Sequence, residues 1–351
     1  MTMTHYADLQ AAIQARQPDF NNMLAILRHE KPARPTLFEF FLNADLYTQL
    51  AGAPCTAVPG DALTYMRWLI SAFRNAGYDY CTTGGSDFSF PTKAYQRQAS
   101  MSQNECATIC NRADFEAYNW LNPDDFDYSR LEQAAEFLPE GMKLIAFGPG
   151  GVLENVTFLA GFDNLCFMLA DDPDLARELF DAVGERLVRY YEHCAPATTV
   201  GALISNDDWG HKTQTMLRVE DMRKYVFPWH KRIVETIHAA GKPAILHSCG
   251  NLEKVMDDVI DEMGYDAKHS FEDTIEPVEE TYERYHRRIA LLGGIDVNFI
   301  CRATPEDVRA RSQAMLQRAA GRGAYALGTG NSVPAYVPNE GYFAMISAAI
   351  I

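Results

Sequence analysis

Two side chains that favour zinc stand one residue apart near the middle of the second half of the chain. Three apolar residues lead into His247, Ser248 and Cys249, and glycine and asparagine follow. In a strand, residues i and i+2 share a face, so the imidazole of His247 and the sulfur of Cys249 can point toward one atom. These are the ligand types that Zn²⁺ favours most. A buried histidine beside an inert, packed cysteine is the alternative interpretation.

Short apolar runs that end in glycine or polar residues alternate with helical patterns along the chain. The runs cover 36–41, 78–83, 143–149, 199–205, 243–249, 265–271, 289–293 and 323–328. The helical patterns between them cover 61–77, 114–137, 153–194, 219–240, 252–263, 276–287, 304–320 and 340–351. Such alternation predicts parallel β-α units. We therefore expect an α/β fold, a (β/α)8 TIM barrel of one domain over 1–351, with an N-terminal helical extension over 1–34. A doubly wound open sheet is the alternative, but no G-x-G-x-x-G follows the first run.

Polar side chains gather at the predicted carboxyl ends of the strands, which meet on one face of a barrel. They are Glu39, Asn206, Asp207, Asp208, His247, Cys249, His269, Glu272, Asp296, Thr329 and Asn331. Glu272 ends the strand that follows the His-x-Cys pair, so neighbouring strand ends can offer imidazole, thiolate and carboxylate to one Zn²⁺. Three protein ligands and one open position are typical of catalytic zinc. A residue that caps the next helix is the alternative for Glu272.

Asp207 and Asp208 form a pair of adjacent carboxylates after the fourth predicted strand. Such a pair can bind a cation, orient a substrate amine or act in acid–base catalysis, or it can cap a helix. Neighbouring side chains point in different directions, so we expect only one inside the site. Lys212 follows closely and can bind a carboxylate or phenolate, or lie exposed. Histidines within helical patterns are expected on the surface; they are His230, His238 and His286.

The composition argues for an acidic cytoplasmic enzyme. The 351 residues carry a formal net charge of −16, and no run rich in lysine and arginine suggests nucleic-acid binding. No stretch reaches the roughly 18 apolar residues of a membrane span, and the polar start resembles no signal peptide. The eight cysteines are scattered, which is typical of reduced thiols in the cytoplasm.

Several motifs in the second half resemble the uroporphyrinogen decarboxylase superfamily. They are Asn206-Asp-Asp-Trp-Gly210, Phe227-Pro228, His247-Ser-Cys-Gly250, Gly293-Gly-Ile-Asp296, Thr304-Pro-Glu-Asp-Val308 and Gly328-Thr-Gly-Asn331. The resemblance implies a (β/α)8 barrel. It also implies one of two activities: decarboxylation in the heme pathway, or zinc-dependent methyl transfer that serves corrinoid proteins or thiols.

The two branches of that superfamily carry different motifs. The decarboxylase branch has arginines after its first strand, where this chain reads 40–45 without arginine, and a catalytic aspartate where this chain reads 81–84. A substrate with eight carboxylates would be repelled by an acidic site without arginines. The methyltransferase branch resembles this chain at His247, Cys249 and Glu272. Its final cysteine, in a Gly-Cys-Gly turn, is replaced here by Thr329.

The resemblance and the strand-end residues together favour a zinc-dependent methyltransferase or demethylase. It would move a methyl group between a small substrate and a corrinoid protein or thiol, with zinc as Lewis acid. The expected roles are as follows: metal ligands His247, Cys249 and Glu272; catalytic groups Asp208 and Glu39; substrate-binding groups Asn206, Asp207, Lys212 and Asn331. The corrinoid would be carried by a partner protein. A decarboxylase of the uroporphyrinogen type and a non-catalytic ligand-binding barrel are the alternatives.

Overall fold

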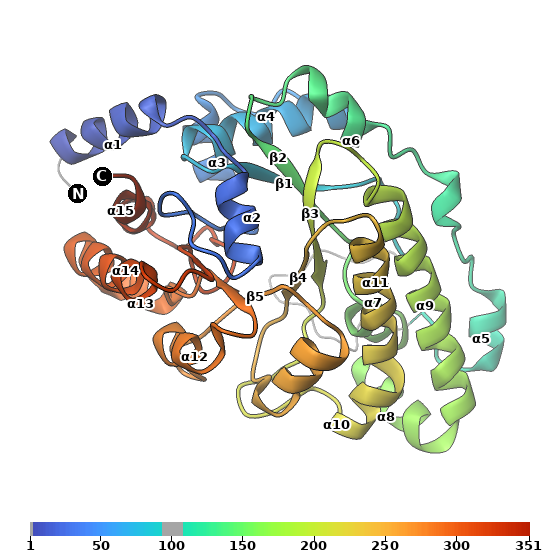
Figure 1. The fold of residues 1–351 in the computed structure, drawn as a ribbon. Helices are drawn as coiled ribbons and strands as arrows, with labels where there is room; N and C mark the ends of the chain where they lie inside the picture. Colours follow the sequence, from blue (N-terminus) through green and yellow to red (C-terminus); the bar gives the residue numbers. More distant parts are fainter. Residues whose placement is uncertain (1–2, 93–107) are drawn as a thin grey trace.

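Seven parallel strands form one curled sheet, in which each strand pairs with the next along the chain (Figure 1). The computed structural model describes residues 3–92 and 108–351, with backbone alone for 3–6. The strands are β1 Tyr80–Gly84, β2 Lys143–Phe147, β3 Val200–Asn206, β4 Ala244–His247, β5 Ala267–His269, β6 Ala290–Leu292 and β7 Tyr325–Ala326. Each strand overlaps one of the predicted apolar runs, so the predicted parallel α/β fold is confirmed.

The first predicted strand, residues 36–41, lies beside β7. Leu37 forms a parallel bridge with Leu327. On its other side, the segment meets β1 through side chains, since the hydroxyl groups of Tyr80 and Thr82 bind its backbone at 2.7 to 2.8 Å. Within the described residues, no backbone ladder joins this segment to β1. Two hydroxyl groups therefore bridge the two edges of the curled sheet.

Helices surround the sheet, and α1 packs against α15 (Figure 1). The α-helices are α1 Met3–Ala15, α2 Asn21–Leu27, α3 Ala44–Ala51, α4 Ala62–Asn75, α5 Arg112–Ala117, α6 Arg130–Gln133, α7 Val152–Ala160, α8 Phe162–Asp171, α9 Pro173–Cys194, α10 Val219–Asp221, α11 Phe227–Ala239, α12 Val278–Tyr285, α13 Val297–Arg302, α14 Pro305–Ala319 and α15 Asn339–Ile350. Short 3₁₀ turns are η1 Pro123–Asp125, η2 Ala134–Glu136 and η4 Glu253–Val255, and π turns are η3 Met222–Val226 and η5 Asp258–Glu262.

One predicted helix was wrong in continuity. Residues 114–137 form separate short helices, because Asn122 adopts an extended backbone ahead of Pro123 and the chain restarts there as a 3₁₀ turn. The helix predicted over 252–263 is present from 253 to 262, as a 3₁₀ turn, two α-helical residues and a π turn in direct succession. The predicted start of α14 is confirmed, since the hydroxyl of Thr304 accepts the backbone N–H of Asp307 at 3.2 Å.

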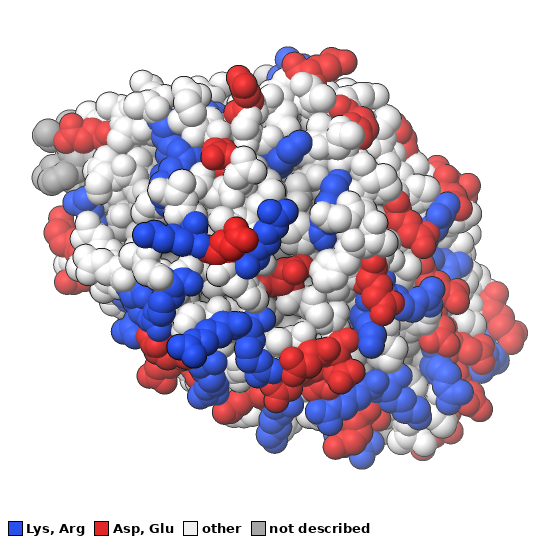
Figure 2. Space-filling view, viewed as in Figure 1, with Lys and Arg blue, Asp and Glu red and all other residues white. Residues whose placement is uncertain are grey.

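Charged side chains of both signs are interspersed over the face seen in Figure 2. No single helix among the described residues is long and apolar enough to cross a membrane, although α7 and α8, bent by 95° at their junction, pass that test as a pair by length and composition.

Candidate metal centre

The loops after β3 and β4 run side by side and bring the central residues together. The backbone N–H of Gly210 donates to the carbonyl of Cys249 at 3.1 Å. The backbone N–H of Cys249 donates to Oδ1 of Asp208 at 2.9 Å. A Cβ atom on Gly250 would lie 2.1 Å from the backbone of Gly210, so any side chain there would push the loops apart. Two glycines thus set the distance between Asp208 and Cys249.

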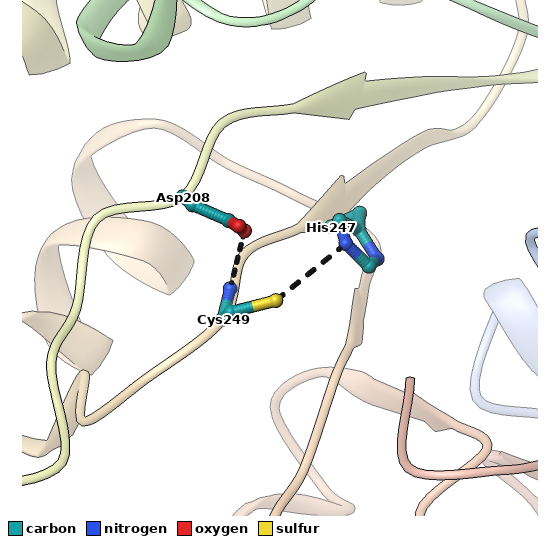
Figure 3. A group of neighbouring side chains, drawn as sticks. All are labelled: Asp208, His247 and Cys249. Atoms are coloured by element: carbon teal, nitrogen blue, oxygen red, sulfur yellow. Dashed lines mark hydrogen bonds between the residues drawn. The ribbon is translucent and has the colours of Figure 1, made fainter. Parts of the chain in front are cut away.

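Asp208, His247 and Cys249 point toward one another from the ends of neighbouring strands (Figure 3). One ligand atom from each lies within 4.8 Å of the other two. The sulfur of Cys249 is 3.8 Å from Nε2 of His247. Zinc bonds of about 2.3 Å to sulfur and about 2.0 Å to nitrogen, at a tetrahedral angle, separate these atoms by about 3.5 Å. The geometry therefore fits a zinc ion held by imidazole, thiolate and carboxylate.

The electrostatics of the three groups also fit a cation. Burial lowers the pKa of His247 to about 4, which keeps the imidazole neutral, as metal binding requires. Burial, and then the charge of Asp208, raise the pKa of the Cys249 thiol to about 12. Without a cation, a thiolate beside this carboxylate is disfavoured. A bound divalent metal would reverse that preference, because it attracts both anionic ligands.

His269 orients His247 for this role. The two Nδ1 atoms lie 2.8 Å apart, and both rings are buried. Only one of these nitrogens can carry a proton in the hydrogen bond between neutral rings. If Nε2 of His247 is to bind a metal, its Nδ1–H must donate to His269, just as metal-bound histidines commonly donate their other ring N–H to a neighbouring acceptor. The sequence predicted that His269 lies among the strand ends but assigned it no role. Its role follows from the pairing of β4 with β5, which places His269 opposite His247.

Further groups surround the sulfur of Cys249. The hydroxyl of Ser270 donates to it at 3.4 Å, and the side-chain amide of Asn331 lies 3.3 Å away. The buried ammonium of Lys268 donates to the carbonyl of Ser270. Burial lowers the pKa of Lys268 to about 8, against the opposing charges of Cys249 and Asp208. Neither Lys268 nor Ser270 was singled out by the sequence, because a single lysine or serine near a strand end has no distinguishing spacing.

Asp207 points away from this cluster and holds the start of α7. Its carboxylate accepts the backbone N–H groups of Leu153 and Glu154 at 2.9 and 2.8 Å. It also lies 2.9 Å from Nε2 of His230. His230 is fully buried, so its predicted surface position was wrong; the carboxylate and the hydroxyl of Tyr265 satisfy its ring. His286 is buried as well, with Nδ1 2.7 Å from a backbone carbonyl.

Glu39 lies beneath the loop that follows β7. The backbone N–H of Thr329 donates to Oε1 at 2.6 Å, and the Thr329 hydroxyl lies 2.7 Å from Oε2 and against the carbonyl of Asn331. One hydroxyl proton cannot serve both oxygens, so both contacts are satisfied only when the carboxyl of Glu39 carries a second proton. Complete burial raises the pKa of Glu39 to about 8, against these hydrogen bonds. Burial and hydrogen bonding therefore both favour the neutral acid at Glu39, which supports the loop carrying Asn331.

The remaining predicted residues lie at different depths. Glu272 is outside the three-residue group, because Ser270 has a positive φ of 86° and turns the chain away after β5; it lines a separate pocket with Lys268. Asn206 ends β3 beside His247, and its Oδ1 is buried without a partner in the described structure. Lys212 is exposed on the turn between Gly210 and Thr215. Residues 86–112, whose polar and irregular sequence predicts an active-site loop or a hairpin excursion, lie largely outside the described residues.

A parallel sheet with nitrogen, sulfur and oxygen ligands at its carboxyl edge defines an α/β protein with a candidate metal centre at the strand ends. The family model described as Uroporphyrinogen decarboxylase (URO-D) matches residues 23–350. The chain belongs to this family.

Relatives and solved structures agree with that assignment at different distances. The chain is 27% identical over 192 residues to a uroporphyrinogen decarboxylase of Anaeromyxobacter dehalogenans and 26% identical over 189 residues to one of another Anaeromyxobacter strain. Each match covers 54% of this chain and 51% of the relative, so the chain spans about half the length of the curated relatives it matches. A methyltransferase from Methanosarcina mazei has the same fold, with a TM-score of 0.67, 16% identity, and coverage of 93% of this chain and 97% of that one.

Proposed function

We propose that this protein is a zinc-dependent methyltransferase or demethylase that moves a methyl group between a small substrate and a corrinoid protein or thiol. The observation that carries the proposal is the group of Asp208, His247 and Cys249, with ligand atoms within 4.8 Å of one another at the strand ends. The structural similarity to a methyltransferase and the family membership support it. In this proposal Asp208 replaces Glu272 as the carboxylate ligand.

The chain's own groups would divide the work around the metal. Bound zinc would supply Lewis acidity toward a thiol, ether or amine. Asn331 and Ser270 would hold the Cys249 sulfur in place through their hydrogen bonds. Asn206, whose Oδ1 lacks a partner in the described structure, would bind the substrate. Glu39 would support the loop through Thr329 rather than touch the reacting atoms.

Zinc content of the purified protein tests the metal centre. We expect about one zinc per chain in the wild type and strong loss in Cys249→Ser, because a hydroxyl stays protonated and is a harder ligand. Asp208→Asn should also lose zinc, whereas Glu272→Gln should keep it. Glu272→Gln is the matched control, since it changes a neighbouring carboxylate that lies outside the group. Zinc loss in Glu272→Gln, with retention in Asp208→Asn, would reverse the assignment.

Methyl transfer is tested separately with methylcobalamin as a stand-in for the corrinoid protein. Transfer to a thiol forms a thioether and releases cob(I)alamin, which is followed by its visible spectrum under anaerobic conditions. Wild-type protein should accelerate this reaction and Cys249→Ser should not. Zinc bound at one per chain without transfer to any of a panel of thiols would instead favour the ligand-binding barrel.

Decarboxylation is a second candidate, because both curated relatives are named uroporphyrinogen decarboxylase. The described residues after the first strand, 40–45, contain no cation that could pair with substrate carboxylates.

We also propose that residues 36–41 complete a (β/α)8 barrel as its eighth strand, and that 1–351 form one domain with 1–34 as a helical extension. The bridge between Leu37 and Leu327 supports this closure.

A further inference from the structure

A cleft of about 760 Å³ opens at the carboxyl ends of β1 and β2. Its size lies in the range of sites for small molecules. Its walls are mostly apolar and aromatic, and its floor is formed by strand-end residues of β1. Its lining includes the side chains of Phe41, Val58, Tyr65, Arg130 and Phe147. None of the three metal-centre residues Asp208, His247 and Cys249 lines this cleft.

The cleft exposes apolar surface that water disfavours. Phe41 is 36% exposed, Tyr65 is 48% exposed and Val58 is 66% exposed, and all three line this one cleft. Single exposed apolar residues are ordinary, but several gathered in one concave site mark a place where a ligand binds. Two of the three are aromatic rings. The walls therefore suit a flat apolar group.

Arg130 is the single cation among the described residues that line the cleft. Its Nε donates to the carbonyl of Gly85 at 2.9 Å, and Nη1 donates to Asp87 at 2.7 Å. These contacts fix the guanidinium, whose side chain is only 15% exposed. Nη2 has no partner within the described structure, and it lies 3.8 Å from where a Cβ on Gly84 would be, at the end of β1. A preorganised donor thus faces the cleft.

The inner wall of the cleft is one ring away from the metal centre. Phe41 and Phe147 line the cleft, and their rings lie 4.0 and 5.3 Å from the ring of Phe40. Phe40 in turn lies 4.8 Å from the ring of His247. A molecule seated against this wall would lie in the same cleft as Arg130, with the ring of Phe40 between it and His247.

We propose that this cleft binds a small aromatic carboxylate, with its ring between the apolar walls and its carboxylate on Arg130. The aromatic walls select the ring, and the single guanidinium selects one anionic group rather than several. This deepens the proposed function by naming the class of its small substrate. It rests on that function only for the statement that the bound molecule reacts; binding itself is independent of the metal.

Calorimetric binding of benzoate and benzamide to the full-length protein tests the proposal. The two probes share ring and shape and differ in charge. We expect benzoate to bind at least about 10-fold more tightly, and Arg130→Gln to remove that preference. Asp87→Asn should tighten benzoate about twofold to threefold, because it frees Nη1 without disturbing the wall. Equal affinity for the two probes in the wild type would overturn the proposal.

A matched pair of exposed sites tests the wall. Val58→Asp should weaken both probes at least about fivefold, since it places a charge on the apolar surface. Phe167→Asp is the control: Phe167 is also 66% exposed, but it lies in α8 outside the cleft. Unchanged binding in Val58→Asp, or equal weakening in Phe167→Asp, would contradict the site.

Cys249→Ser separates this proposal from the proposed function. It should bind benzoate as the wild type does, because the cleft does not use the metal. Retained benzoate binding in a wild type that transfers no methyl group would support the cleft and remove the methyl-transfer chemistry. Methyl transfer without benzoate binding would do the reverse.

Discussion

Replacing Glu39 by glutamine tests whether this buried carboxyl is a neutral support or an ionised catalyst. Glutamine reproduces the hydrogen bonds of the protonated acid. Its Oε1 accepts the backbone N–H of Thr329, and its amide donates to the Thr329 hydroxyl, which can then donate to the carbonyl of Asn331. Glu39→Gln should therefore leave the loop and the position of Asn331 unchanged. If Glu39 were instead an ionised carboxylate, glutamine would not reproduce its charge or its hydrogen bonds.

The magnitude follows from the pKa of Glu39, which burial raises from 4.5 to about 8. Between these values the folded state holds a proton that the unfolded state has released, so stability falls as pH rises through this window. At about 1.4 kcal/mol per pH unit, the full difference is about 5 kcal/mol, and about 3 kcal/mol of it is reached by pH 7. Glutamine does not titrate. We expect the variant to match the wild type near pH 4.5 and to exceed its stability by several kcal/mol at pH 8.5.

Denaturant unfolding of both proteins at several pH values between 5 and 8.5 measures this difference directly. Subtracting the two curves removes every other titrating group. Glu140→Gln, at an exposed glutamate, is the control and should leave the wild-type pH dependence unchanged. A stability difference that stays constant across this range would refute the protonated carboxyl. Loss of methyl transfer in a stable Glu39→Gln variant would return Glu39 to the catalytic role expected from the sequence.

Three further outcomes follow from contacts around the metal centre. Asp207→Ala should lower the free energy of unfolding by about 3 kcal/mol, since it leaves buried backbone donors and His230 without an acceptor; urea unfolding measures this, and unchanged zinc content would show that Asp207 is not a ligand. His269→Ala should weaken zinc binding about 10-fold to 100-fold without removing a ligand, because His247 loses the acceptor for its Nδ1–H; competition with a chelator measures it, and unchanged affinity would refute the orienting role. Uroporphyrinogen under anaerobic conditions should give no coproporphyrinogen, and clear turnover would favour the decarboxylase instead.

Local pattern was sufficient to predict the order of strands and the start of α14. Apolar runs that end in glycine or polar residues mark the strands, because parallel strands are buried on both faces. The continuous helix predicted over 114–137 failed for a related reason. Its periodicity indicates which residues are buried, and short helices and 3₁₀ turns bury the same residues without one continuous helix.

The sequence by itself predicted that His247 and Cys249 lie together at a strand end, because alternation along a strand depends only on neighbouring residues. In the structure β4 ends at His247 and Cys249 follows in the loop, with its sulfur 3.8 Å from Nε2 of His247. Which carboxylate joins them was decided by tertiary structure. The contact of Gly210 with Gly250 brings Asp208 to the sulfur, and the turn at Ser270 takes Glu272 away. Asp207 and Asp208 are identical in type and adjacent, yet one caps α7 and the other faces the centre. The positions of these carboxylates depend on how segments far apart in the chain approach one another, and the local sequence pattern does not predict that approach.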